Sequence, residues 1–329
     1  MTGRPRSRHA LGAALALLVG AAPAAAQAPG HDDEGDVVER AELTVGPSRR
    51  PIRAVVVDNA LGDVRVEGHD ADQVTIISVK HAPDVDTLER LRVTLVPDPD
   101  GTVRLTTALG DGRERPPASL AMLRIDLTIR VPRSARVDGR VSSGRLEVKN
   151  VDGGAELDAG AGTIHVENVA GRVQARSVDG DQQFQTVFGD LDAHAVDADL
   201  ALDTIRGRVL TAQIHSGSID ARRVASRDVR LLAIDGDIHV DADTADWRQR
   251  GSIIVSSLRG DVDVSVRATV RLKVRARAGG EVVLAGAMTR AGNARWIEGQ
   301  FGAAGRPSQL GTVKLESRYG DVAFSVVNP

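Results

Sequence analysis

Four carboxylates near the middle of the chain could support acid–base chemistry. They are Asp190, Asp192, Asp197 and Asp199. Glycoside-cleaving enzymes use two such groups, about 5–10 Å apart, in a groove that usually carries aromatic side chains. No aromatic residue lies between Phe188 and Trp247. The pattern favours a protein without catalytic residues, and a carbohydrate-active enzyme remains the alternative.

A second set of carboxylates recurs directly after glycine. Its members are Asp63, Asp181, Asp190, Asp237, Asp261 and Asp321. A calcium-binding nonapeptide roll needs an aspartate at one fixed place in every repeat, whereas Arg, Gly, Thr or Ser often stands here instead. Turn chemistry explains these aspartates better than calcium ligation.

Neither histidine nor cysteine indicates a metal-binding or catalytic site. His165 and His239 share one outward slot several coils apart, while His194 and His215 fall elsewhere in the repeat. Zinc needs three or four converging ligands, so we expect solvated surface histidines. The chain has no cysteine, which excludes disulfides and thiol nucleophiles. We therefore predict no catalytic, cofactor-binding or metal-binding residue.

One basic stripe could bind an anionic ligand. It consists of Arg271, Lys273, Arg275 and Arg277. Alternation along a strand puts these side chains on one face, where they could hold an anionic polymer. The preceding strand offers Asp261 and Asp263, so cross-strand charge pairing is the simpler interpretation. Both interpretations stay open.

A repeat of nine or ten residues between Gly144 and Asp235 must position these groups. Glycine opens most blocks, and positions three, five and eight are nearly always apolar. Side chains alternate faces along a strand, so positions three and five share one face and position eight would lie on the other. Because position eight is apolar as well, we predict a bend at positions six and seven in every block. Two blocks then form one coil of about 18 residues. We predict an all-β protein, a parallel β-solenoid with position eight inside.

The position of the repeat defines the segments expected in the rest of the chain. Residues 285–311 carry Trp296 and Phe301, and we expect this insertion to cap the open end of the solenoid rather than to form a ligand flap. We expect a single solenoid domain over 51–329. The predicted segments are a disordered or extended lead-in at 27–50, a less regular β region with one short helix (85–91) at 51–140, regular coils at 141–265, and C-terminal strands at 266–329.

The N-terminus has the parts of a secretory signal peptide. Three arginines within residues 4–8 precede an apolar run, Leu11 to Ala22, and small residues end at Ala26. The run is too short to span a membrane. We predict a leader over 1–26, cleaved after about Ala26, and an extracytoplasmic protein. The formal charge of −3 becomes −6 without the three leader arginines, which argues against nucleic-acid partners.

Several motifs resemble one bacterial family. The recurring small-Gly-x-Ile/Val-x-Val unit, the strand ending in Val131-Pro132 and the closing segment Gly311–Val322 are similar to the DUF4097 family of envelope proteins. The resemblance covers roughly 50–327. It implies a β-helix-like fold and a candidate adhesin, and it brings no catalytic residues.

The predicted function is a non-catalytic module of the cell envelope that binds a glycan or protein partner. Repeated polar positions such as Glu147, His165, Gln183 and Asp220 would make many weak contacts. The alternatives are a carbohydrate-active enzyme on the same scaffold and a structural protein that assembles end to end. Because capped ends argue against assembly, we expect a monomer.

Overall fold

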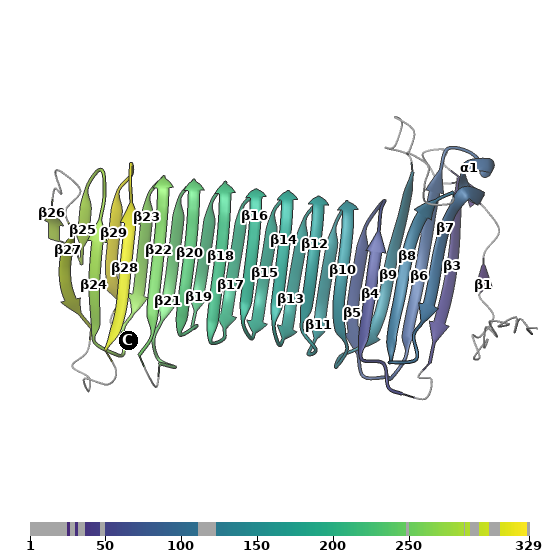
Figure 1. Ribbon diagram of the computed structural model, residues 1–329, viewed down its shortest axis with the longest axis horizontal. Helices are drawn as coiled ribbons and strands as arrows, with labels where there is room; N and C mark the ends of the chain where they lie inside the picture. The colour runs from purple at the N-terminus through teal and green to yellow at the C-terminus, as the bar shows by residue number, and fades with distance from the viewer. Residues whose placement is uncertain are drawn as a thin grey trace, which may run out of the picture.

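The protein forms a long solenoid of stacked β-coils (Figure 1). The computed structural model describes residues 25–26, 30–31, 37–46, 50–110, 123–247, 250–285, 287–289, 296–302 and 310–327. These residues are nearly all in strands that pair into two sheets. The predicted all-β, mostly parallel solenoid is confirmed.

Sheet A contains 16 strands among the described residues. Its hydrogen-bonded order is β1 (Ala25–Ala26), β3 (Val37–Val45), β6 (Val74–Ala82), β9 (Arg124–Pro132), β5 (Val64–His69), β11 (Leu146–Val151), β13 (Ile164–Ala170), β15 (Gln182–Phe188), β17 (Leu200–Arg206), β19 (Ile219–Val224), β21 (Ile238–Asp243), β23 (Val262–Arg267), β29 (Val322–Val327), β25 (Val282–Leu284) and β26 (Ala287–Thr289), with β2 (Gly30–His31) paired to β3.

Sheet B contains 13 strands in the same part of the chain. Its order is β27 (Ile297–Phe301), β24 (Leu272–Arg277), β28 (Gly311–Ser317), β22 (Ser252–Arg259), β20 (Asp228–Asp235), β18 (Val209–Ser216), β16 (Leu191–Asp197), β14 (Val173–Asp179), β12 (Ala155–Ala161), β10 (Arg136–Ser143), β4 (Ala54–Asn59), β8 (Thr102–Leu109) and β7 (Leu91–Pro97).

Each regular coil gives one strand to each sheet. Leu146 pairs with Ile164, Ile164 with Gln182 and Gln182 with Leu200, so one coil is 18 residues long, as predicted. Equivalent side chains therefore stack in rows along the solenoid. Most inward rows are apolar and fill the core between the sheets; Leu146, for example, is fully buried.

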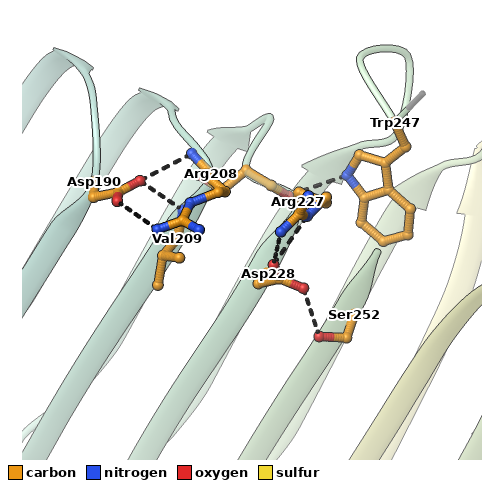
Figure 2. A network of polar contacts seen from close by, with 8 residues as sticks. Asp190, Arg208, Val209, Arg227, Asp228, Trp247 and Ser252 are labelled. Carbon is orange, nitrogen blue, oxygen red and sulfur yellow. Dashed lines mark hydrogen bonds and ion pairs between the residues drawn. The ribbon is translucent and has the colours of Figure 1, made fainter. Parts of the chain in front are cut away.

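The aspartates that follow glycine tie neighbouring coils together. Asp190 Oδ1 accepts hydrogen bonds from the backbone N–H groups of Arg208 (3.1 Å) and Val209 (3.0 Å) in the next coil, as Figure 2 shows. The same bond is repeated from the N–H groups of Arg145 to Asp63, Asp199 to Asp181, Asp261 to Asp237, Asp321 to Asp261 and Glu281 to Asp321. These carboxylates therefore act in the turns, which supports the turn-chemistry interpretation.

Glycine at the corners allows the coils to approach closely. Gly180 has φ of +125°, and a Cβ at this position would lie 2.5 Å from the carbonyl oxygen of Gly162. Both the backbone conformation and the contact exclude a larger side chain. Stacked corner glycines thus explain why the repeat opens on this residue.

The bend predicted at positions six and seven occurs in five strands of sheet A, namely β11, β13, β15, β17 and β19. The seventh residue of each of these blocks has a left-handed backbone conformation. These residues are Asn150, Asn168, Thr186, Thr204 and Arg223, with φ of 57°, 51°, 57°, 57° and 51°. This conformation interrupts the alternation of faces, and position eight returns to the core. Val187 is fully buried for this reason.

Sheet B has no such slip, so the prediction that position eight is inside in every block is wrong for this sheet. Its strands alternate regularly, with positions three, five and seven inward. Val178, Val196 and Ile234 consequently lie outside and are 60%, 50% and 40% exposed. Apolar residues that the repeat assigned to the core therefore form part of the surface.

The block 207–216 needs a second correction. It has ten residues, and the extra residue shifts its register against the preceding coil, because Leu191 pairs with Leu210. Leu210 is buried, whereas Val209, predicted to point inward at position three, is only partly buried. Counting positions from the glycine misses an insertion that the strand absorbs.

Antiparallel pairing closes the N-terminal end of the solenoid. β6 pairs antiparallel with both β3 and β9, and β9 then pairs in parallel with β5, which starts the regular stack. The predicted short helix is confirmed as α1 (Val85–Arg90), with its buried Leu88. The range 27–50, predicted as a disordered or extended lead-in, contains β3. Residues 1–24 of the predicted leader lie outside the described residues.

The C-terminal strands enter between two earlier coils. β28 lies between β22 and β24, and β29 lies between β23 and β25. The outermost strand of sheet B is β27, which pairs antiparallel with β24. Phe301 of β27 packs on Phe324 of β29, with ring centroids 5.4 Å apart. Residues 286, 290–295 and 303–309 of the predicted cap lie outside the described residues.

Thr186→Asn should stabilise the protein. Thr186 is β-branched and has φ of 57°, a conformation that suits asparagine far better. Asparagine would also extend the ladder in which Asn168 Nδ2 donates to Asn150 Oδ1 at 2.7 Å. We expect the free energy of unfolding in urea to rise by about 1 kcal/mol. Thr211→Asn, in a regular strand of sheet B, is the matched control and should bring no gain.

Candidate functional site

The repeated polar positions lie in one row on the outer side of sheet A. We call this the sheet A row; its members are Glu147, His165, Gln183, Ala201, Asp220 and His239. Parallel pairing sets them about 4.8 Å apart, one in each coil. The shared slot predicted for His165 and His239 is confirmed. The small side chain of Ala201 leaves a gap between Gln183 and Asp220.

Glu147 anchors one end of the sheet A row. Its side chain is only 7% exposed, and its carboxylate lies 2.5 Å from Arg65 Nε and 2.8 Å from Lys149 Nζ. Burial alone would raise the pKa of the Glu147 carboxyl. The hydrogen bonds from Lys149 and Arg65 outweigh burial, so the pKa lies below its usual value. The carboxylate is therefore held ionised and fixed in place.

Further contacts order the neighbouring coils. Lys149 Nζ also lies 2.8 Å from Glu167 Oε2. His165 Nδ1 donates to Gln183 Oε1 at 3.1 Å. The side chains of three successive coils thus hold one another in place, and a ligand would meet an arranged polar surface rather than free side chains.

Two shallow grooves follow the sheet A row. The first has a volume of about 380 Å³ and is lined by residues that include Arg145, Glu147, His165 and Gln183. The second has a volume of about 190 Å³, and its lining includes Gln183 and Asp220. Gln183 lines both grooves, which flank the sheet A row on its two sides. Polar side chains of the row are therefore accessible from both grooves.

The predicted anionic-ligand stripe lies on the outer side of sheet B, on and beside β24. Lys273 and Arg275 contact Glu298 of β27 at 3.4 and 2.9 Å, and Arg277 pairs with Glu316 of β28. Arg271 is exposed at the start of the strand. Charge pairing therefore occurs, but the partners predicted in the preceding strand, Asp261 and Asp263, are wrong. That strand, β23, belongs to sheet A.

Trp296 lies over the same stripe. Its ring centroid is 5.1 Å from the guanidinium carbon of Arg275, 5.2 Å from that of Arg277 and 5.1 Å from Lys314 Nζ. Such contacts stabilise cations on an aromatic face. The sequence predicts a cap rather than a ligand flap for Trp296 and does not place it beside these cations, because that position depends on the antiparallel pairing of β27 with β24.

Three of the four central carboxylates have partners of their own. Asp190 binds backbone N–H groups, and Asp192 lies 2.9 Å from His194 on sheet B. Asp199 accepts a hydrogen bond from the N–H group of Ser218 at the start of a sheet A strand. Among the described residues, no group of three or more histidine or carboxylate side chains could hold a metal ion.

A family model matches the part of the chain that forms the coils just described. The model of Toastrack DUF4097 matches residues 52–280. The chain belongs to this family. The matched range holds the regular coils and the sheet A row, so the row is part of a Toastrack fold rather than an appended segment.

Several solved structures share features with this Toastrack protein. They include a candidate adhesin from Parabacteroides distasonis (10% identity, 87% of this chain and 96% of that chain, TM-score 0.48) and one from Bacteroides fragilis (12%, 86% and 96%, 0.42). A candidate lipid-binding protein from Parabacteroides distasonis is similar at 9% identity (86% and 96%, TM-score 0.44). No curated protein matches the sequence. The described residues contain no helix long and apolar enough to cross a membrane.

Glu147→Gln should make the Toastrack protein less stable at neutral pH. The lowered pKa means that ionised Glu147 stabilises the fold above the ordinary carboxyl pKa of 4.5, and that this stabilisation is lost as the pH falls through the lower folded value. We expect a loss of about 1–3 kcal/mol at pH 7. The difference between the variant and wild type should shrink in acid. Unfolding curves from pH 7 to 3 test this, and a constant difference would contradict it.

Proposed function

We propose that the protein is a non-catalytic module of the bacterial cell envelope that binds an extended glycan or protein partner along the sheet A row. The observation that carries this proposal is the in-register alignment of polar side chains from Glu147 to His239. A linear glycan fits best, because the length of one pyranose residue is close to the spacing of the coils.

Binding along such a row would be multivalent. Each exposed hydrogen bond contributes only about 0.5–1.5 kcal/mol, but a ligand that spans several coils makes several such contacts after the cost of association is met once. The side chains of the row are already ordered by their neighbours, which lowers the entropy cost. Affinity should therefore rise steeply with ligand length.

The location of the protein is part of the proposal. The predicted leader over 1–26 supports export, with cleavage after about Ala26. An acidic net charge disfavours nucleic acid as the partner. Asp190 and Asp199 are engaged by backbone N–H groups and Asp192 by His194, which supports a role in binding rather than hydrolysis.

The stripe of Arg271, Lys273, Arg275 and Arg277 is a secondary contact in this proposal. Three of its four cations already have a glutamate partner, Glu298 or Glu316. An anionic ligand would have to displace these carboxylates, which reduces the gain from each new pair. Arg271 is the member best placed to meet such a ligand.

Co-sedimentation with polysaccharide and membrane fractions of a Gram-negative envelope tests the proposal. We expect wild type to bind and the double variant His165→Ala/Gln183→Ala to bind several-fold more weakly, because two successive coils lose their polar groups. Gln174→Ala, on the outer side of sheet B, is the matched control and should bind as wild type does.

Three results would contradict this function. Failure to bind every polysaccharide fraction would exclude a glycan partner. Equal loss in the double variant and in the Gln174→Ala control would exclude the sheet A row. Release of soluble sugar from the polysaccharide would show an enzyme instead.

A further inference from the structure

A mainly apolar row runs along the outer side of sheet B. We call it the sheet B row; its members are Val178, Val196, His215, Ile234 and Leu258, which the strand register aligns in successive coils. The row exists because sheet B lacks the left-handed residue that turns position eight inward in sheet A. Its valines and isoleucine contribute nothing to the core.

The sheet B row lies in an open trough. Two grooves of about 440 and 500 Å³ follow it, and both are lined by Gln213 and Ile234. Leu232 adds a further apolar side chain to the second groove. Single exposed apolar residues are ordinary on a soluble protein, but several aligned in one row, here interrupted by His215, mark an interaction site.

We infer that a second copy of this chain packs on the sheet B row and forms a two-fold symmetric dimer. A partner must match a row whose members recur about every 4.8 Å, and another copy has this spacing by construction. With the two-fold axis parallel to the solenoid, each apolar side chain meets its own equivalent.

The charges beside the row complement one another under this symmetry. Arg176 and His194 lie on one side of the row, and Asp179 and Asp197 lie on the other side at the corner. The two-fold axis brings Arg176, which lies 4.0 Å from Glu156 of its own chain, opposite Asp179 of the second copy. It places His194, which already contacts Asp192 at 2.9 Å, beside Asp197 of the second copy. Among the described residues, neither Asp179 nor Asp197 has an ion-pair partner, so both carboxylates are available.

The dimer differs from the expected monomer. That expectation followed from the capped ends, which block end-to-end assembly but leave the outer side of sheet B uncovered. The dimer also leaves the sheet A row free. Because sheet A and sheet B are opposite walls of the solenoid, two copies joined through sheet B turn their sheet A rows outward on opposite sides. Such a dimer would have two equal binding faces.

Sedimentation equilibrium of the protein, purified as its host produces it, tests this inference. We expect a monomer–dimer equilibrium that Val178→Lys/Val196→Lys weakens by about tenfold or more, which corresponds to about 1.4 kcal/mol. Val96→Lys is the matched control, since Val96 is 46% exposed on β7 outside the row. Circular dichroism confirms that each variant is folded.

A charge exchange tests the symmetry. Arg176→Glu and Asp179→Arg should each weaken the dimer, and the double variant should restore it, because the arginine introduced at position 179 would face the glutamate introduced at position 176 of the other copy. A monomer at every concentration, or a dimer that the lysine variants leave unchanged, would overturn the inference. Two weakened single variants without rescue would overturn the parallel two-fold arrangement. Binding to the envelope is measured separately, so failure of either proposal is distinguishable.

Discussion

One backbone constraint shapes the regular coils of this protein: the left-handed residue at position seven of the sheet A strands β11, β13, β15, β17 and β19. Asn150 and its equivalents have φ between 51° and 57°, and this single conformation shifts the alternation of faces by one residue. Val151, Val169 and Val187 are thereby buried. The strands of sheet B keep their alternation, so the same repeat position has opposite environments on the two walls of the solenoid.

Much of the fold was predictable because a solenoid is local. Glycine at the corners, apolar residues at positions three and five, and blocks of nine residues specify a coil of 18 residues without knowledge of distant contacts. The failures have physical causes. The face on which the side chain of Val178 lies depends on the φ of the residue before it. The residue type of Thr186 does not indicate a positive φ. The entry of β28 and β29 between earlier coils is a long-range pairing that no local pattern encodes.

The candidate site was predictable only in part. The outward slot shared by His165 and His239 follows from counting, because the coils between them stack regularly. The fixed carboxylate of Glu147 depends on Arg65, 82 residues away in sequence, and the place of Trp296 over Arg275 depends on antiparallel pairing. The two walls consequently differ: sheet A presents ordered polar side chains, and sheet B presents a row of apolar ones.

The difference between the walls can be measured directly by thiol labelling. The chain has no cysteine, so Val178→Cys and Val187→Cys would each introduce a single thiol at position eight, one in sheet B and one in sheet A. In dilute solution, where the monomer prevails, we predict that a water-soluble maleimide modifies the thiol at position 178 rapidly and the thiol at position 187 only after unfolding. Equal protection of both thiols would contradict the assignment of faces on which the two binding surfaces depend.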